Sequence, residues 1–278
     1  MQPRPADLDQ MRHVLGDRRW LVLTGAGVST DSGIPDYRGP DAPVRTPMTY
    51  QEFAAGPDAQ RRYWARAHLG WNRMREAQPN TTHHRLASLE AVGRLSGLIT
   101  QNVDGLHRRA GSRDLVELHG RLDRVVCLDC GVRSGRSRVH RRLDELNPHW
   151  NHDAPIAPDG DTLFDDTDGF VVAPCERCGG RLKPDVVFFG ENVNKETVER
   201  CYRITDRAQA LVVLGSSLQV MSGLRFVRRA HENGIPVVIV NRGATRGDDL
   251  AAVRIDAGCA ETLSAWAEAA SPSRTFVT

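Results

Sequence analysis

The sequence predicts an α/β fold in which a doubly wound, Rossmann-like parallel sheet forms a large domain and two insertions form a smaller one. Three observations predict it. Short apolar runs end at a glycine or a polar turn and alternate with amphipathic helical patterns, which is typical of a parallel sheet covered on both faces. A glycine-rich turn follows the first run, and two Cys-x-x-Cys pairs flank residues 131–174.

Five apolar runs and five helical patterns define the predicted sheet. The strands are expected at 20–25, 97–102, 115–120, 210–215 and 236–241. The helices are expected at about 6–16, 81–94, 194–208, 223–233 and 259–270. In such sheets ligands bind beyond the carboxyl ends of the strands, where polar clusters follow these runs.

Two segments interrupt the alternation and divide the chain into domains. Residues 1–40, 81–120 and 183–278 are predicted to form the large domain. A helical insertion, rich in proline and aromatic residues, is expected at 41–80, and a zinc-ribbon insertion at 121–182. Inside the second, an arginine-rich run at 133–142 and the aspartates of 153–168 are interpreted as a solvated, charged segment rather than a polyanion site.

Composition excludes several classes of protein. The 278 residues are enough for a hydrophobic core that is stable without cross-links. No apolar run reaches the roughly 20 residues of a membrane span, and the start "MQPRPADLDQMRH" lacks the apolar stretch of a secretory signal. The formal net charge of +2 gives no general support for nucleic-acid binding. We therefore expect a cytoplasmic protein that binds neither a membrane nor a nucleic acid.

The cysteine spacing indicates one structural zinc ion. Two Cys-x-x-Cys turns can each present two sulfurs to one point, which suits the four thiolates that zinc prefers. The predicted ligands are Cys127, Cys130, Cys175 and Cys178. Two disulfides or free thiols are the alternative. Cys201 and Cys259 are interpreted as ordinary semi-buried thiols.

The segment "LVLTGAGVSTDSGIPDYRG" predicts a phosphate-binding turn. Gly25 and Gly27 let backbone amides approach a pyrophosphate where a helix begins. Thr30 replaces the third glycine of the dehydrogenase fingerprint, and no acidic residue ends a strand about 20 positions later. A standard dehydrogenase geometry is therefore disfavoured, and a tight structural turn remains the alternative.

Polar side chains also follow the second and third predicted strands. In "TQNVDGLHRRAG", Gln101, Asn102 and Asp104 can hydrogen-bond a carboxamide and ribose hydroxyls, or can cap the next helix. His119 ends the next strand, eight residues before Cys127. Taken alone, His119 is either a catalytic base or a semi-buried histidine whose ring nitrogens are hydrogen-bonded within the protein.

These motifs, in this order, resemble the sirtuins. The matching stretches are "GAGVSTDSGIPDYRG", "TQNVDGLHRRAG", "ELHG", the two Cys-x-x-Cys pairs, "LKPDVVFFGE", "GSSLQV" and "IVNRG". The resemblance covers residues from roughly 10 to 270 and is greatest to the class II branch, which includes the fourth human, mitochondrial sirtuin, and to its bacterial relatives. It implies an NAD-dependent protein lysine deacylase that releases nicotinamide and 2′-O-acyl-ADP-ribose.

The resemblance also implies roles for individual residues. His119 would be the catalytic base, acting with Asn102 and Asp104, and four cysteines already complete the zinc tetrahedron without it. The implied NAD contacts are Gly25, Ala26, Gly27, Ser29, Asp36, Tyr37, Arg38, Arg45, Gln101, Asn102, Val103, Asp104, Gly215, Ser216, Ser217, Asn241, Arg242, Gly243 and Cys259. The acyl-lysine peptide would bind as an added strand at Val187, Phe188, Gly190 and Glu191. Ser222 stands where the family often has a proline.

The sequence leaves two questions open: which acyl group is preferred and which reaction is catalysed. Tyr63-x-x-Arg66 has the spacing by which acidic-acyl sirtuins place a phenol and a guanidinium in the acyl pocket, so we hypothesise a preference for acidic or branched acyl groups. The alternative is a packed tyrosine and a surface arginine. Mono-ADP-ribosyl transfer, lipoamide removal and a non-catalytic NAD sensor are the competing functions, and a monomer is expected.

Overall fold

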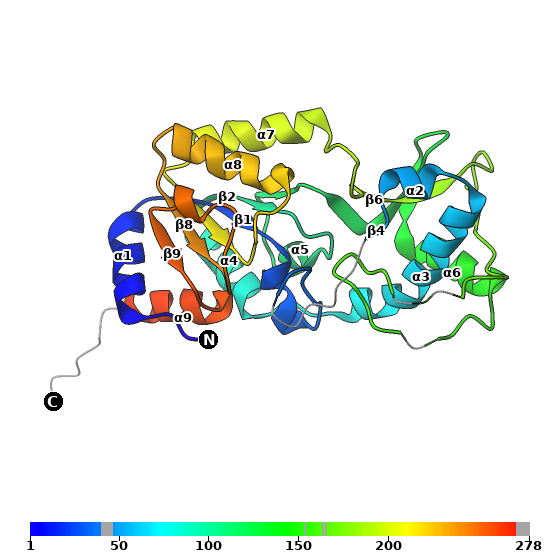
Figure 1. Ribbon diagram of the computed structural model, residues 1–278, viewed down its shortest axis with the longest axis horizontal. Coiled ribbons are helices and arrows are strands. Elements are labelled where there is room, and N and C mark those ends of the chain that lie inside the picture. Colours follow the sequence, from blue (N-terminus) through cyan, green and yellow to red (C-terminus); the bar gives the residue numbers. More distant parts are fainter. Residues whose placement is uncertain (40–46, 153, 163, 165, 271–278) are drawn as a thin grey trace.

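The computed structural model describes residues 1–39, 47–152, 154–162, 164 and 166–270. Figure 1 shows an elongated molecule with two lobes, and the chain passes between them several times. The larger lobe contains a six-stranded sheet and the smaller lobe a three-stranded sheet. The fold class predicted from the sequence is confirmed.

The large sheet is parallel throughout. Its strand order is β3-β2-β1-β7-β8-β9, so the order reverses between β1 and β7. The strands are β1 (Trp20–Thr24), β2 (Leu95–Thr100), β3 (Leu115–Glu117), β7 (Ala210–Leu214), β8 (Val237–Val240) and β9 (Val253–Ile255). All residues of β1, β7 and β8 are buried, which explains why these strands are continuous apolar runs in the sequence.

Helices cover both faces of this sheet. The helices of the large lobe are α1 (Pro5–Leu15), α4 (Thr81–Ala91), α5 (Leu106–Arg109), α7 (Lys195–Asp206), α8 (Met221–Glu232) and α9 (Cys259–Ala270). Figure 1 shows α7 and α8 on one side and α1 and α9 on the other. The side chains of β1 alternate accordingly: Trp20 packs in the cluster that contains Trp266, while Leu21 packs in the cluster that contains Phe226.

Short turns of 3₁₀ helix supplement these elements. They are η1 (Ala26–Val28), η2 (Thr30–Ser32) and η3 (Asp248–Leu250). All five predicted strands and all five predicted long helices are present, with ends that differ by up to three residues. The third strand ends at Glu117, so His119 lies in the turn after it rather than at its last position. β9 has only three residues, too few to show periodicity in the sequence.

The small lobe combines the two insertions. Its elements are α2 (Tyr50–Ala54), α3 (Pro57–Glu76), β4 (Gly120–Cys127), β5 (Arg133–Gly135), α6 (Arg136–Leu146) and β6 (Leu182–Val186). β4 pairs antiparallel with both β5 and β6. The predicted boundary after residue 182 falls inside β6, because this strand stays paired with β4 up to Val186 before the chain returns to the large lobe. The other domain boundaries stay predictions.

The arginine-rich segment is not solvated at every residue, contrary to expectation. Arg136 is 1% exposed, and its guanidinium lies over the rings of Trp64 and Trp71, 4.8 and 5.2 Å from their centroids. It donates a hydrogen bond of 2.8 Å to the carbonyl of Ala67. The first residue of α6 thus pins that helix to α3, because aromatic faces and a carbonyl replace water around the cation.

Two further expectations concern burial and membranes. Cys201 is fully buried and Cys259 is 7% exposed, so both thiols belong to the core rather than being semi-buried. Cys201 packs between α7 and the sheet, in the cluster that contains Phe226.

Within the described residues, no helix is both long and apolar enough to cross a membrane.

Replacing Arg136 by alanine tests this α3–α6 contact. We expect a loss of roughly 2–4 kcal/mol in the free energy of unfolding, because the Ala67 carbonyl and the two indole faces lose a buried partner. Arg138→Ala is the matched control in the same helix, since Arg138 is largely exposed and pairs with Glu176. Urea unfolding should show a clear midpoint decrease for the first variant only; equal midpoints would contradict the assignment.

Candidate active site and metal centre

Two glycine-rich turns touch where the strand order reverses. The amide of Gly27, after β1, donates a hydrogen bond of 2.9 Å to the carbonyl of Gly215, after β7. Gly215 has φ +58°, and a Cβ there would lie 2.6 Å from the amide nitrogen of Val28. A Cβ on Gly25 would lie 2.8 Å from the Gly215 carbonyl oxygen. Only glycine fits this contact, which leaves a cradle of bare backbone at the strand ends.

A cavity of about 620 Å³ opens beyond these turns. Its walls come from the ends of β1, β2, β7 and β8 and from residues 186–193, which begin at the last residue of β6. Every predicted NAD or peptide contact that the structure describes lines this cavity, except Cys259. Arg45 lies outside the described residues.

Three polar side chains form a connected group on one wall. Asn102 Nδ2 donates to Ser29 Oγ at 3.0 Å, and Ser29 Oγ donates to Asp104 Oδ2 at 2.7 Å. The other oxygen of Asp104 accepts from the amide of Leu106, the first residue of α5, at 2.8 Å, so this carboxylate both binds the start of the helix and belongs to the group. Burial raises the pKa of Asp104 above its usual value, against the lowering effect of these hydrogen bonds.

His119 stands next to this group with both ring nitrogens engaged. Nδ1 lies 2.9 Å from the carbonyl oxygen of Gln101, and Nε2 lies 2.8 Å from Ser222 Oγ. A carbonyl can only accept, so Nδ1 carries the proton and Nε2 accepts from the serine hydroxyl. Burial lowers the pKa of His119 below 6.5. The imidazole is therefore neutral at pH 7, with its lone pair on Nε2 beside the cavity.

Ser222 is the contact that the sequence patterns did not assign. It is the second residue of α8, and it stands where the resembling family often has a proline. A proline could not donate to the imidazole. The only signal in the sequence is the serine at this proline position. Its role depends on the contact with His119, which the sequence does not show.

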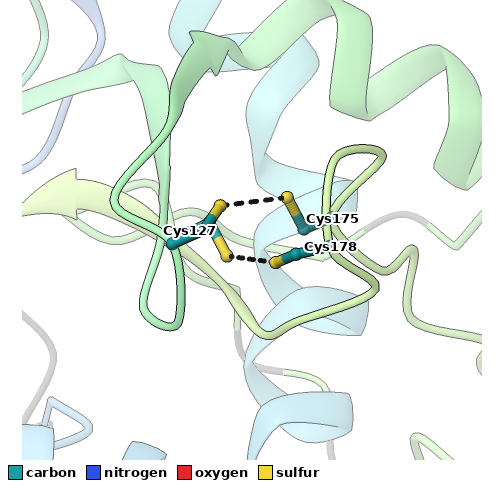
Figure 2. Close-up of side chains that lie close together, drawn as sticks. Cys127, Cys175 and Cys178 are labelled. Atoms are coloured by element: carbon teal, nitrogen blue, oxygen red, sulfur yellow. Dashed lines mark hydrogen bonds between the residues drawn. The ribbon is translucent and has the colours of Figure 1, made fainter.

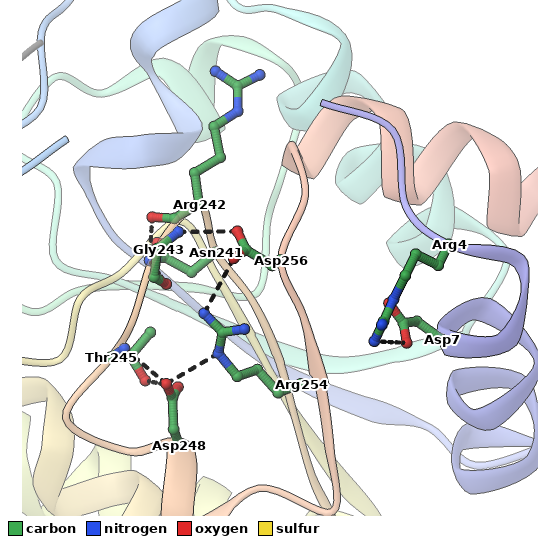
Figure 3. A network of polar contacts seen from close by, with 9 residues as sticks. All are labelled: Arg4, Asp7, Asn241, Arg242, Gly243, Thr245, Asp248, Arg254 and Asp256. Carbon is green, nitrogen blue, oxygen red and sulfur yellow. Dashed lines mark hydrogen bonds and ion pairs between the residues drawn. The ribbon is translucent and has the colours of Figure 1, made fainter. Parts of the chain in front are cut away.

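The far wall is held by a network after β8. Asn241 Nδ2 donates to the carbonyls of Arg242 and Gly243, at 2.9 and 3.0 Å. Figure 3 shows how Asp256 then accepts from the amide of Gly243 at 3.0 Å and lies beside Arg254. The turn that carries Asn241 is thus held by Asp256, the residue that follows the neighbouring strand β9.

Cys259 lies behind this wall rather than on it. Its Sγ is 3.8 Å from the carbonyl oxygen of Val240, and burial raises the pKa of its thiol to about 12. The thiol is protonated at neutral pH and packs beneath the site.

The predicted peptide segment is braced by an ion pair. Lys183 Nζ lies 2.9 Å from Glu191 Oε2, and the lysine is 4% exposed. The same carboxylate oxygen accepts from the amide of Phe188 at 2.9 Å. The side chain of Glu191 therefore holds the turn at 188–191, while its neighbours face the cavity.

Tyr63 and Arg66 are not brought together in the cavity. Tyr63 lines the cavity and packs against Phe53 and Phe188, with ring centroids 5.4 and 5.1 Å apart. Arg66 is not among the residues that line it. Its Nε donates to the carbonyl of Thr162 at 2.8 Å, and its guanidinium pairs with Asp161, which is 3% exposed.

The segment 157–162 also enters the cavity wall, which the charge pattern did not reveal. Pro158, Asp159 and Asp161 all line the cavity. The expectation of a solvated aspartate run is therefore wrong for Asp161. Its burial is compensated by the ion pair with Arg66.

The four paired cysteines converge in the small lobe. Figure 2 shows sulfurs of the two knuckles facing each other, with Cys127 Sγ 3.6 Å from Cys178 Sγ and Cys130 Sγ 3.8 Å from Cys175 Sγ. Four thiolates about 2.3 Å from a tetrahedral ion would be about 3.8 Å apart, whereas a disulfide needs about 2.05 Å. The arrangement therefore suits zinc and excludes disulfides in this state.

The two knuckles have the same backbone design. The amide of Gly131 donates to the carbonyl of Cys127, and the amide of Gly179 donates to the carbonyl of Cys175, at 2.9 and 2.8 Å. Both glycines have positive φ, at 70° and 73°. His119 is not a member of this cluster, so the metal centre and the cavity are separate sites.

Comparison with known proteins gives the family. The model of the Sir2 family matches residues 25–222, which span the glycine-rich turn, both cysteine knuckles and the start of α8. The chain belongs to the Sir2 family. This confirms the resemblance to the sirtuins.

Sir2 proteins from several bacteria and from cattle are similar along nearly the whole chain. A protein named "NAD-dependent protein deacetylase 1" from Streptomyces coelicolor is 56% identical, covering 92% of this chain and 87% of the relative. The protein of the same name from Mycobacterium avium is 49% identical, covering 96% and 97%. The mitochondrial "NAD-dependent protein lipoamidase sirtuin-4" of Bos taurus is 45% identical, covering 91% and 82%.

Solved Sir2 structures share the fold. A structure described as Sir2 with a p53 peptide and NAD⁺ has a TM-score of 0.78 and 31% sequence identity, covering 95% of this chain and 98% of that one. Another, described as Sir2 bound to acetylated peptide, has a TM-score of 0.74 and 29% identity, covering 95% and 98%.

Removing the metal from this Sir2 chain should unfold the small lobe. The two knuckles are joined by the four sulfurs, and small metal modules lose their fold without the ion. We expect a strong chelator, or Cys178→Ser, to release zinc and change the fluorescence of the small-lobe tryptophans. His119→Ala should keep its sulfur-bound zinc and its fold. Zinc release with unchanged fluorescence and unchanged protease resistance would contradict this.

Proposed function

We propose that this Sir2 protein is an NAD-dependent protein lysine deacylase. The single observation that carries the proposal is His119: a neutral imidazole, with Nδ1 fixed on a backbone carbonyl and Nε2 at a cavity that is walled by a bare glycine cradle and the Ser29–Asn102–Asp104 group. The names of its relatives, which cite NAD-dependent deacetylation, support it.

The residues present fit a bound NAD. The cradle of Gly25, Gly27 and Gly215 has no room for a Cβ, so backbone can approach a pyrophosphate closely. Asn102 and Asp104 offer an amide and a carboxylate to a carboxamide and hydroxyls. When bound, NAD would supply the ribose that loses nicotinamide and accepts the acyl group, and one water molecule is consumed, so that the products are nicotinamide, free lysine and 2′-O-acyl-ADP-ribose.

His119 acts in this proposal as a general base through Nε2. The bond from Nδ1–H to Gln101 keeps the lone pair on Nε2, and a proton taken there from a ribose hydroxyl leaves an imidazolium that the Gln101 carbonyl stabilises. Ser222 is a positioning residue, because its hydroxyl holds the ring until the substrate hydroxyl takes its place.

The protein partner we propose is an acyl-lysine segment bound as an added strand. It would lie between residues 187–190 and residues 217–220, both of which line the cavity. Backbone pairing of this kind gives affinity with little sequence selectivity. A monomer in the cytoplasm, without nucleic-acid or membrane partners, stays a prediction.

We propose that the cavity favours uncharged acyl groups over acidic ones. The hypothesis of an acidic preference rested on Arg66, which does not line the cavity and whose charge is matched by Asp161. Asp159 also lines the cavity, so a carboxylate-bearing acyl group would meet a like charge there, beside an Asp161 whose charge Arg66 already matches. Branched or long uncharged groups fit the apolar neighbours Tyr63 and Phe188.

Lipoamide removal and mono-ADP-ribosyl transfer are the second candidates. The lipoamidase name of the cattle sirtuin-4 relative supports the first. Mass spectrometry separates them from deacetylation, because lipoyl removal yields lipoyl-ADP-ribose and transfer leaves ADP-ribose on the protein. A non-catalytic NAD sensor would give none of these products.

The His119→Ala variant tests the proposed base. We expect NAD-dependent release of acetyl-lysine peptides to fall by about 10²–10⁴-fold, the usual contribution of a positioned base. NAD binding and sulfur-bound zinc should persist, because His119 is not one of the four thiolate ligands. Turnover equal to wild type, measured as 2′-O-acyl-ADP-ribose formed, would refute the role.

The pH dependence follows from the lowered pKa of His119. The base works when neutral, so kcat/KM should be flat near pH 7 and fall as the pH drops through a pKa below 6.5. Ser222→Ala removes a donor that favours the neutral ring, so the acid limb should move to higher pH. Ser222→Thr keeps the hydroxyl and should keep the limb in place; a limb that does not move in either variant would exclude the contact.

A panel of acyl peptides tests the preference. Acetyl and lipoyl peptides should turn over faster than succinyl or hydroxymethylglutaryl peptides, because Asp159 repels a second carboxylate. Asp159→Asn should raise turnover of the succinyl peptide relative to the acetyl one. A wild-type preference for succinyl that is lost in Arg66→Ala would instead restore the acidic-acyl hypothesis.

A further inference from the structure

A second group of metal-ligating side chains lies in the small lobe, apart from the four cysteines. His68 belongs to α3, and His140 and Asp144 belong to α6. One ligand atom from each lies within 4.8 Å of the other two. His140 and Asp144 are four residues apart on one helix, so they share a face, and His68 meets that face from α3.

The two imidazoles are buried and the carboxylate is open to solvent. Each histidine is 4% exposed, whereas the Asp144 side chain is 54% exposed. The rings are tilted by 35° with centroids 4.3 Å apart, and both Nε2 atoms lie near the same carboxylate. His68 Nε2 is 3.3 Å from Asp144 Oδ1, and His140 Nε2 is 3.8 Å from Asp144 Oδ2.

Hydrogen bonding within the described structure does not account for these histidines. Neither Nε2 makes a hydrogen bond to Asp144, since one contact is long and the other exceeds hydrogen-bond range. The Nδ1 atoms of both rings are buried without any partner. The two Nε2 atoms instead converge on one carboxylate without a hydrogen bond to it, which leaves the lone pairs of both rings available to a ligand there.

The geometry fits a metal ion better than a hydrogen-bonded triad. Ligand atoms about 2.0–2.2 Å from a tetrahedral ion would be separated by about 3.3–3.6 Å. The distance from His68 Nε2 to Asp144 Oδ1 is 3.3 Å, and His140 Nε2 lies 3.8 Å from the other oxygen of the same carboxylate. Burial lowers the pKa of His68 to about 4 and of His140 to about 3, so both rings are neutral at pH 7 and can offer lone pairs.

We propose that His68, His140 and Asp144 form a second divalent metal site, of the two-histidine, one-carboxylate type. Imidazole and carboxylate together suit zinc, cobalt or nickel rather than calcium or magnesium. The exposed side of Asp144 leaves the remaining positions to water. The ion would join α3 to α6, in addition to the contact made by Arg136.

Two features make this site weaker than the four-cysteine site. The guanidinium groups of Arg136 and Arg75 lie near enough to disfavour further positive charge at the histidines. The unpartnered Nδ1 atoms lack the acceptors that usually orient and strengthen histidine ligands, which costs about 10–100-fold in affinity. We therefore expect an exchangeable ion, removed by chelators before the sulfur-bound zinc.

Cobalt titration of the full-length protein, loaded with one zinc per chain, tests the proposal. Co²⁺ should bind with one equivalent per chain and give d–d absorption without a sulfur-to-metal charge-transfer band. Zn²⁺ added at the same stage should raise the thermal midpoint. Asp144→Asn should reduce Co²⁺ affinity by at least 10-fold, and it should fold normally because this side chain is largely exposed.

His140→Gln and His152→Gln complete the test. The first should abolish the nitrogen-ligated band while retaining sulfur-bound zinc, which reports that the small lobe is folded. The second is the control, because His152 is exposed on the same lobe and is not a member of the cluster. No second equivalent in the wild type, or an unchanged band in both Asp144→Asn and His140→Gln, would overturn the proposal.

Discussion

The hydrogen bond from His119 Nδ1 to the carbonyl of Gln101 is the interaction on which the site depends. It joins the ends of β3 and β2 and fixes which ring nitrogen faces the cavity. The same residue links the lobes, because its own carbonyl accepts from the amide of Val187 at the end of β6. Its Nε2 reaches α8 through Ser222. One turn therefore aligns the large sheet, the small sheet and the helix beside the proposed peptide path.

The metal centre and the catalytic cavity have separate tasks. The four sulfurs hold together an insertion whose own core is small, and the chain then delivers β6 to the large lobe in register with β4. Loss of zinc would act on catalysis through the position of residues 187–190, whereas loss of His119 would leave the knuckles intact. The short sequence between His119 and Cys127 is β4, which physically connects the two.

The sequence was most informative where a residue type has few physical alternatives. Continuous apolar runs gave the parallel strands, paired cysteines gave the metal cluster, and Gly25, Gly27 and Gly215 marked a contact that no side chain permits. It was least informative where a charge could find a partner far along the chain. Arg136, Arg66 and Asp161 read as surface charges, yet each is largely buried by partners on another segment, which local pattern cannot reveal. The role of Ser222 likewise depends on a contact with a residue more than a hundred positions away.

The tautomer of His119 tests the central claim most directly. Long-range ¹H–¹⁵N NMR on selectively labelled, zinc-loaded protein distinguishes a protonated ring nitrogen from one with a free lone pair. At pH 7 the account predicts a neutral His119 with the proton on Nδ1 and an unprotonated Nε2 that gains its proton at a lower pH than an ordinary imidazole. A proton on Nε2 at neutral pH, or a shift typical of a metal-bound nitrogen, would contradict it.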